Sequence, residues 1–274
     1  MTNPYELLML DIDGTILDGN RNISAADREA ISKVRDLGIK ISLSTGRVVE
    51  GSLDIISDLS LDNYHIFFDG ALVSNPNSGK EIFAKPIDKE IVGRAVNFAH
   101  ENEIALNLYS SKNYFIEKED WASNLRKEFY HTKPILSDFN QLWREERIIK
   151  GALTLRSPED RAKAELLYRE FSDVLNISYT KTPAFTDIDF INILAPGVSK
   201  GNSLERLAEY LGIPLAKTIA VGDGPNDVSL LAVAGLAIAM GNAPDNLRDV
   251  ADFVTLDVNH SGLSKAISKF INYP

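Results

Sequence analysis

Cysteine is absent from the 274 residues of this chain. Disulfide bonds, thiolate metal sites and a cysteine nucleophile are therefore excluded. Positive charge is also scarce, since Lys and Arg number 29 against 39 Asp and Glu, which gives a formal net charge of −10. Because no basic run is available to follow a phosphate backbone, nucleic acid is not an expected partner.

Long hydrophobic runs are missing as well. No stretch approaches the roughly 18–20 apolar residues that a membrane-spanning helix needs. The N-terminus lacks the basic start and the apolar length of a signal peptide. These absences predict a cytoplasmic protein without a membrane partner.

The residues that are present indicate an α/β fold. Hydrophobic residues make up 44% and charged residues 25%, which is ordinary for a globular chain with a sizeable core. Short apolar runs alternate with amphipathic ones, the pattern of strands joined through helices in a Rossmann-like parallel sheet. Strands are expected near residues 5–10, 39–43, 66–68, 218–221 and 237–240, and helices are expected to begin at Ser24, at Ser199 and near Ser261.

The middle of the chain differs from its two ends. It holds both tryptophans and has alternating runs at residues 104–109 and 148–155. A helix start is marked at Ser157-Pro158, where Ser caps and Pro occupies the first turn. We interpret residues 86–186 as an inserted α+β cap domain. Residues 1–85 and 187–274 then form a discontinuous catalytic core, with no Gly/Ser-rich linker at either junction.

Polar, reactive groups directly follow three of the apolar runs. Each group alone is weak evidence, because Asp-Gly is also plain turn chemistry. Their common position after a strand is what indicates a site, since ligands of an open parallel sheet bind at the carboxyl ends of its strands. The three segments are Asp11-Ile12-Asp13-Gly14-Thr15, Thr45-Gly46-Arg47 and Gly222-Asp223-Gly224-Pro225-Asn226-Asp227.

Four carboxylates would converge if these strands are neighbours: those of Asp11, Asp13, Asp223 and Asp227. They cannot all stay ionised in one cleft without a compensating cation. Oxygen ligands from a few aspartates together with a phosphate suit Mg²⁺ better than Ca²⁺. The sequence therefore predicts a Mg²⁺ cofactor.

With these motifs in place, the chain resembles a haloacid dehalogenase-superfamily phosphatase of the Cof-type subfamily, whose large α/β cap is inserted in the core. The resemblance covers nearly the whole length. Besides the three segments above, it includes Val198-Ser199-Lys200-Gly201, Phe68-Asp69-Gly70-Ala71 and Ala239-Met240-Gly241-Asn242-Ala243.

The resemblance implies a role for each carboxylate. Asp11 is expected to be the nucleophile that forms an aspartyl-phosphate. Asp13 is expected to act as general acid and then as general base. The metal ligands would be Asp11, Asp13 through its backbone carbonyl, and Asp223. Asp227 would hold Lys200 or the waters of the metal ion without binding the ion directly.

The resemblance also implies the groups that bind phosphate, which are Thr45, Gly46, Lys200 and Asn226. A lysine at a helix start is poorly placed by itself because the helix N-terminus is already positive. Its presence there indicates anionic neighbours.

Two further residues of the motifs are candidate substrate contacts. Arg47 either contacts the substrate or pairs with a surface carboxylate. Asp69 replaces the usual Asn of the subfamily's Asn-Gly-Ala segment, which adds negative charge near the substrate or caps a turn. Gly224-Pro225 also departs from the common pattern, so substrate preference rather than catalysis is in doubt.

The leading hypothesis is a Mg²⁺-dependent phosphatase for a small phosphorylated metabolite, such as a sugar phosphate, acting as a monomer or homodimer. A sugar phosphomutase that uses the same nucleophile is the alternative within enzymes. A halide-releasing hydrolase is disfavoured by Asp13 and the metal cluster. A non-catalytic phosphate-ligand-binding protein is disfavoured because the whole set of site residues is intact.

Overall fold

The computed structural model describes residues 3–130, 133–182 and 185–271, and its contacts divide the chain into two compact units. Unit 1 comprises Met1–Arg47, Leu53–Phe83 and Ser199–Pro274, and unit 2 comprises Val48–Ser52 and Ala84–Val198. Unit 2 ends later than residue 186, the boundary set from the sequence, because the strand β11 (Phe185–Leu194) pairs with strands of unit 2.

A five-stranded parallel sheet forms the centre of unit 1, so the predicted α/β class with a parallel-sheet core is confirmed. Leu10 of β1 pairs with Val221 on one side and with Leu43 on the other. The ends of three successive strands therefore meet at one edge of the sheet. The strand order is β14 (Phe253–Val254), β13 (Leu236–Ala239), β12 (Thr218–Gly222), β1 (Leu7–Leu10) and β2 (Lys40–Leu43).

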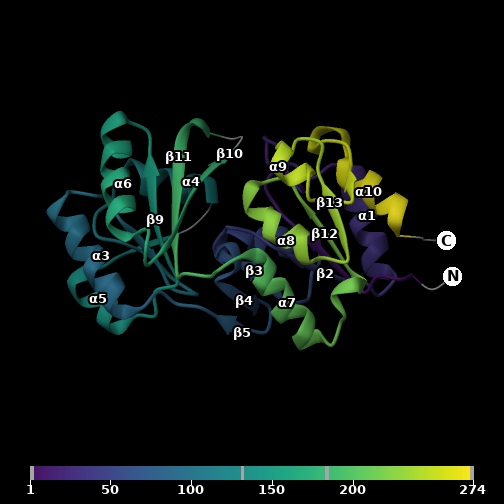
Figure 1. Ribbon diagram of the computed structural model, residues 1–274, viewed down its shortest axis with the longest axis horizontal. Helices are drawn as coiled ribbons and strands as arrows, with labels where there is room; N and C mark the ends of the chain where they lie inside the picture. Colours follow the sequence, from purple (N-terminus) through teal and green to yellow (C-terminus); the bar gives the residue numbers. More distant parts are fainter. Residues whose placement is uncertain (1–2, 131–132, 183–184, 272–274) are drawn as a thin grey trace. The chain divides into compact units, whose positions relative to one another are not determined.

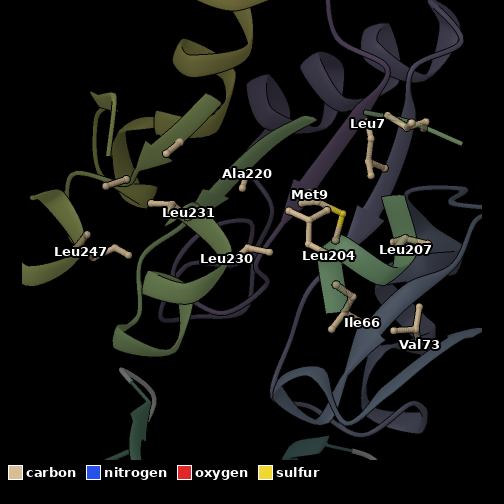
Figure 2. Close-up of a cluster of buried hydrophobic side chains, with 14 residues drawn as sticks. Leu7, Met9, Ile66, Val73, Leu204, Leu207, Ala220, Leu230, Leu231 and Leu247 are labelled. Carbon is tan, nitrogen blue, oxygen red and sulfur yellow. The ribbon is translucent and has the colours of Figure 1, made fainter. Parts of the chain in front are cut away.

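Helices cover both faces of this sheet. Residues Leu7 and Met9 of β1 belong to a buried apolar cluster with Leu204 and Leu230 from α7 (Lys200–Leu211) and α8 (Val228–Val233) (Figure 2). Alternate residues of a strand point to the opposite face. On that side α1 (Ala25–Asp36) packs on α10 (Gly262–Phe270), and Figure 1 shows α8 and α10 on different sides of β12 and β13.

Local signals explain where the helices begin and end. Ser24 caps α1 by accepting a hydrogen bond from the backbone amide of Asp27. Ser199 caps α7, and Gly212 ends it in the left-handed conformation with φ 67°. The predicted helix starts at Ser24 and Ser199 are confirmed, and the cap at Ser199 fixes the position of Lys200 as the first residue of the helix.

The third predicted strand does not join the parallel sheet. It forms β3 (His65–Phe67), which pairs antiparallel with β4 (Leu72–Asn75) in a small sheet completed by β5 (Lys80–Ala84). A single parallel bridge between Ser44 and Ile66 connects it to the end of β2. This bridge brings the residues after β3 beside those after β2.

Shorter segments complete unit 1. They are α2 (Leu53–Asp58), α9 (Asp245–Arg248) and 3-10 turns at Phe68–Gly70, Leu215–Lys217, Pro225–Asp227 and Val258–His260. Another 3-10 turn, Glu50–Ser52, lies in the part of the chain that belongs to unit 2.

Unit 2 is built on a six-stranded mixed sheet of order β10-β11-β9-β6-β7-β8. Its helix α6 begins at the predicted Ser157 cap, where Ser157 and Asp160 bond each other's backbone amides. The strands are β6 (Asn107–Tyr109), β7 (Tyr114–Ile116), β8 (Pro134–Leu136), β9 (Lys150–Leu155), β10 (Asn176–Thr182) and β11. The helices are α3 (Lys89–Glu101), α4 (Trp121–Tyr130), α5 (Phe139–Glu145) and α6 (Pro158–Phe171).

Within residues 3–130, 133–182 and 185–271, no helix is both long enough and apolar enough to cross a lipid bilayer.

The core of unit 1 predicts the outcome of one truncation. Leu204 is fully buried between α7 and the sheet, so Leu204→Ala should lower the free energy of unfolding by about 2–5 kcal/mol. Leu37→Ala deletes the same atoms at a position that is 39% exposed and should cost within about 0.5 kcal/mol. Urea unfolding followed by circular dichroism measures both, and equal losses would contradict this packing.

Candidate active site

Acidic and hydroxyl side chains from three neighbouring strands lie at one edge of the unit 1 sheet. Asp11 follows β1, Thr45 follows β2 and Asp223 follows β12. The backbone amide of Asp11 still donates to the carbonyl oxygen of Val221 at 3.0 Å, so the strands stay paired up to the site. The strand-end residues that the sequence singled out are thus brought together by the sheet itself.

Lys200 lies at the centre of this edge. Its side chain is completely buried, and its Nζ donates to Asp11 Oδ1 at 2.5 Å and to Asp227 Oδ1 at 2.6 Å. Burial alone would lower the pKa of Lys200, but the two carboxylates outweigh it and raise the pKa above its ordinary value. The anionic neighbours expected for this lysine are therefore present, and it is charged at neutral pH.

Asp227 holds both Lys200 and the turn after β12. Its second oxygen, Oδ2, accepts from the backbone amides of Asp223 at 3.0 Å and Gly224 at 2.9 Å. The side chain is fully buried. Gly222 makes this approach feasible, because a Cβ at that position would lie 2.6 Å from Asp227 Cγ. With every bond directed at neighbours, Asp227 acts as a support for the site.

Asp223 is held by two residues that the sequence analysis did not assign to the site. Thr15 Oγ1 donates to Asp223 Oδ1 at 2.9 Å, and Asn242 Nδ2 donates to Asp223 Oδ2 at 3.0 Å. The same amide of Asn242 donates to the carbonyl oxygen of Gly14. Both residues lie in quoted motifs, so a signal existed, but only the folded loops show what each contacts.

The loop after β1 approaches Asp223 very closely. Gly14 has φ 89°, and a Cβ there would lie 2.1 Å from Asp223 Oδ2. Only glycine fits this combination of a positive φ and a close carboxylate. Burial, followed by repulsion from Asp227, raises the pKa of Asp223 to about 7. A partly buried carboxyl with such a pKa is typical of a functional site.

Three carboxylates offer ligands for a cation. One oxygen from each of Asp11, Asp223 and Asp227 lies within 4.8 Å of the others. Burial, opposed by Lys200 and reinforced by the other two aspartates, raises the pKa of Asp11 well above its usual range. Among the described residues, no group donates to Asp11 Oδ2. Oxygen donors crowded in this way fit a hard divalent ion, with Asp11 and Asp223 best placed to bind it.

Asp13 is held apart from this group. Arg47 donates to it through two parallel bonds, from Nε to Oδ2 at 2.7 Å and from Nη2 to Oδ1 at 2.5 Å. The guanidinium is nearly buried, with a side-chain exposure of 4%. The sequence had left Arg47 with either the substrate or a surface carboxylate as partner. The structure pairs Arg47 with the site residue Asp13, whose side chain is not part of the group formed by Asp11, Asp223 and Asp227.

The remaining predicted residues line the loops after β2, β3 and β12. Thr45 is buried, and its Oγ1 accepts from the backbone amide of Arg47 at 3.1 Å. Asn226 Nδ2 donates to Asp69 Oδ1 at 2.7 Å. Gly46 lies against Asp69, since a Cβ at residue 46 would be 2.9 Å from either oxygen of that carboxylate. Every predicted site residue thus lies in unit 1.

The strand ends of this parallel sheet carry a buried lysine, hydroxyl and amide groups, and oxygen ligands for a divalent ion. Such a site is typical of the class of proteins that act on phosphorylated compounds. A model of the haloacid dehalogenase-like hydrolase family matches residues 8–267, and the chain belongs to this family. The resemblance stated from the motifs is therefore confirmed.

Similar proteins carry phosphatase names. The phosphatase YwpJ of Bacillus subtilis is 27% identical, over 94% of this chain and 97% of its own. The 5-amino-6-(5-phospho-D-ribitylamino)uracil phosphatase YitU, also of Bacillus subtilis, is 27% identical over 99% of both chains. The crystal structure of TM0651 from Thermotoga maritima shares the fold, with a TM-score of 0.86, 24% identity and 98% of each chain covered. Family and relatives together make this chain a phosphatase enzyme.

The pairing of Lys200 predicts a large cost for its removal. Lys200→Met leaves the carboxylates of Asp11 and Asp227 buried without a cation, so the free energy of unfolding should fall by about 3–5 kcal/mol. Lys33→Met is the matched control, since Lys33 pairs with Glu29 on the exposed side of α1 and should cost within about 0.5 kcal/mol. Urea titrations in metal-free buffer compare the two, and a small cost at Lys200 would show that the burial is incomplete.

Proposed function

We propose that the protein is a Mg²⁺-dependent phosphatase that hydrolyses small phosphomonoesters through an aspartyl-phosphate on Asp11. The observation that carries the proposal is the pairing of buried Lys200 with Asp11, next to Asp223. A cation fixed beside a carboxylate whose other oxygen is unengaged is the arrangement that a nucleophile for phosphate esters requires.

The reaction proceeds in two displacements. In the first, a carboxylate oxygen of Asp11 attacks phosphorus in line, the bond from phosphorus to the ester oxygen breaks, and Asp13 gives a proton to the departing alkoxide. In the second, water attacks the phosphorus of the aspartyl-phosphate and transfers a proton to Asp13. The carboxylate of Asp11 is regenerated and inorganic phosphate leaves.

Asp13 transfers these protons beside Arg47. Each of its oxygens accepts one bond from the guanidinium and keeps a second lone pair that can carry a proton. Because Arg47 is nearly buried, it fixes the direction from which Asp13 approaches the ester oxygen.

The positive and polar groups bind the phosphate. Lys200 supplies a fixed charge, and Thr45, Gly46 and Asn226 supply hydroxyl and amide donors. When bound, Mg²⁺ would be held by Asp11, Asp223 and the backbone carbonyl of Asp13, and it would screen the repulsion between the nucleophile and the phosphate dianion.

The substrate is proposed to be a small phosphorylated metabolite. The relative YitU is named for a small molecule that carries its phosphate on a ribityl chain, which supports this class. The net charge of −10 supports it as well, since a nucleic-acid backbone would be repelled. We assign the choice among such metabolites to unit 2, the segment inserted in the sequence of unit 1.

Loss of the nucleophile should abolish turnover. Asp11→Asn should reduce hydrolysis of an aryl phosphate with Mg²⁺ by at least about 10³-fold, because the amide cannot form the covalent intermediate. EDTA should remove the activity of the unmodified chain. Asp36→Asn, an exposed change of the same charge, should leave the rate unaltered. Phosphate release at the normal rate from Asp11→Asn would refute the covalent route.

Mg²⁺ binding should weaken as pH falls. The metal competes with a proton at Asp223, whose pKa is raised to about 7 by burial. Since the deprotonated form is the ligand, the dissociation constant should rise about tenfold from about pH 8 to about pH 6. Isothermal titration calorimetry with MgCl₂ measures the change. A pH-independent affinity would show that Asp223 is not a ligand.

A further inference from the structure

Asp69 carries a buried charge that the proposed chemistry does not use. Its exposed fraction is 9%, and it lies in the turn after β3 with φ 53° and ψ 27°. Asp and Asn are among the few residues other than glycine that adopt this left-handed conformation readily. The position therefore selects a short polar side chain but does not by itself require a charged one.

The backbone around Asp69 is held on two sides. Its amide donates to the carbonyl oxygen of Thr45 at 3.0 Å, which ties it to the loop after β2. The next residue, Gly70, accepts a bond from Ser203 Oγ at 2.6 Å, and a Cβ on Gly70 would lie 2.2 Å from the carbonyl oxygen of Ser199. The turn is thus fastened to the start of α7, and the carboxylate has a fixed place.

That place lies among the groups expected to bind phosphate. Asp69 Oδ1 accepts from Asn226 Nδ2 at 2.7 Å, and the carboxylate also lies against Gly46. A carboxylate only accepts, so Asn226 must direct its NH₂ group toward Asp69. A bond to a charged acceptor is roughly twice as strong as one to a neutral acceptor. Asp69 therefore holds the donor that a phosphate oxygen would need.

We propose that Asp69 competes with phosphate for the amide of Asn226 and so lowers the affinity of the active site for phosphate. The inference rests on the proposed function, in which Asn226 is a phosphate donor. Asp69 is a specificity-determining residue in this scheme and not a catalytic one. Weaker binding of the inorganic phosphate product favours its release.

Asp69→Asn tests the competition with little risk to the fold. Asn has the same shape and accepts the left-handed backbone, while its amide oxygen is the weaker acceptor. Inorganic phosphate should bind about tenfold more tightly to Asp69→Asn, the order of change expected when the competing acceptor for the amide of Asn226 is neutral instead of charged. Isothermal titration calorimetry with Mg²⁺ present measures the binding, and Asp36→Asn, the same charge change on the surface, should leave it unaltered.

A double mutant separates competition from simple charge repulsion. In the Asn226→Ala background the gain from Asp69→Asn should shrink to less than about twofold, because the contested donor is gone. An unchanged phosphate affinity in Asp69→Asn overturns the proposal, as does a full gain that persists without Asn226. Calorimetry needs no turnover, so a chain that binds phosphate but hydrolyses no ester would refute the proposed function and leave this comparison interpretable.

Discussion

The buried contact of Lys200 with Asp11 and Asp227 is the interaction on which the rest of unit 1 depends. It joins residues that are 189 and 27 positions apart in the chain, so the end of β1, the start of α7 and the turn after β12 are fixed to each other by one ammonium group. A lysine with no exposed surface is tolerable only with such partners. The same contact that stabilises the fold therefore builds the site.

An excess of negative charge follows from this arrangement. Two cations, Lys200 and Arg47, face five aspartates at the sheet edge. Asp11 and Asp227 share Lys200, whereas Asp13 accepts from Arg47 and Asp69 from Asn226. Asp223 accepts side-chain bonds from Thr15 and Asn242, which are neutral. A divalent ion at Asp11 and Asp223 would relieve the two site aspartates whose pKa values burial raises.

The sequence predicted those parts of the structure that local patterns encode. The helix starts at Ser24, Ser157 and Ser199 could be predicted because a capping side chain bonds to backbone within a few residues of it. The meeting of acidic residues at one sheet edge could be predicted because the carboxyl ends of parallel strands form the ligand-binding edge. The pairing of Arg47 with Asp13 and the contact of Asn226 with Asp69 could not be predicted, because each joins loops that meet only after folding. The late end of unit 2 was missed for a related reason, since β11 is defined by its partners β9 and β10.

Asp69 shows why a site that binds phosphate can contain a charge that opposes binding. In the proposed mechanism, Lys200, the hydroxyl and amide donors and a divalent ion would attract the substrate ester and the phosphate product alike. Attraction that is equal for substrate, transition state and product does not accelerate the chemical step and slows release. In the proposed scheme, a carboxylate that competes for a single donor weakens the complex with the free product, while Asp11, the proposed nucleophile, keeps its bond from Lys200. The departure from the subfamily pattern at residue 69 would then change affinity beside the chemistry and not the chemistry itself.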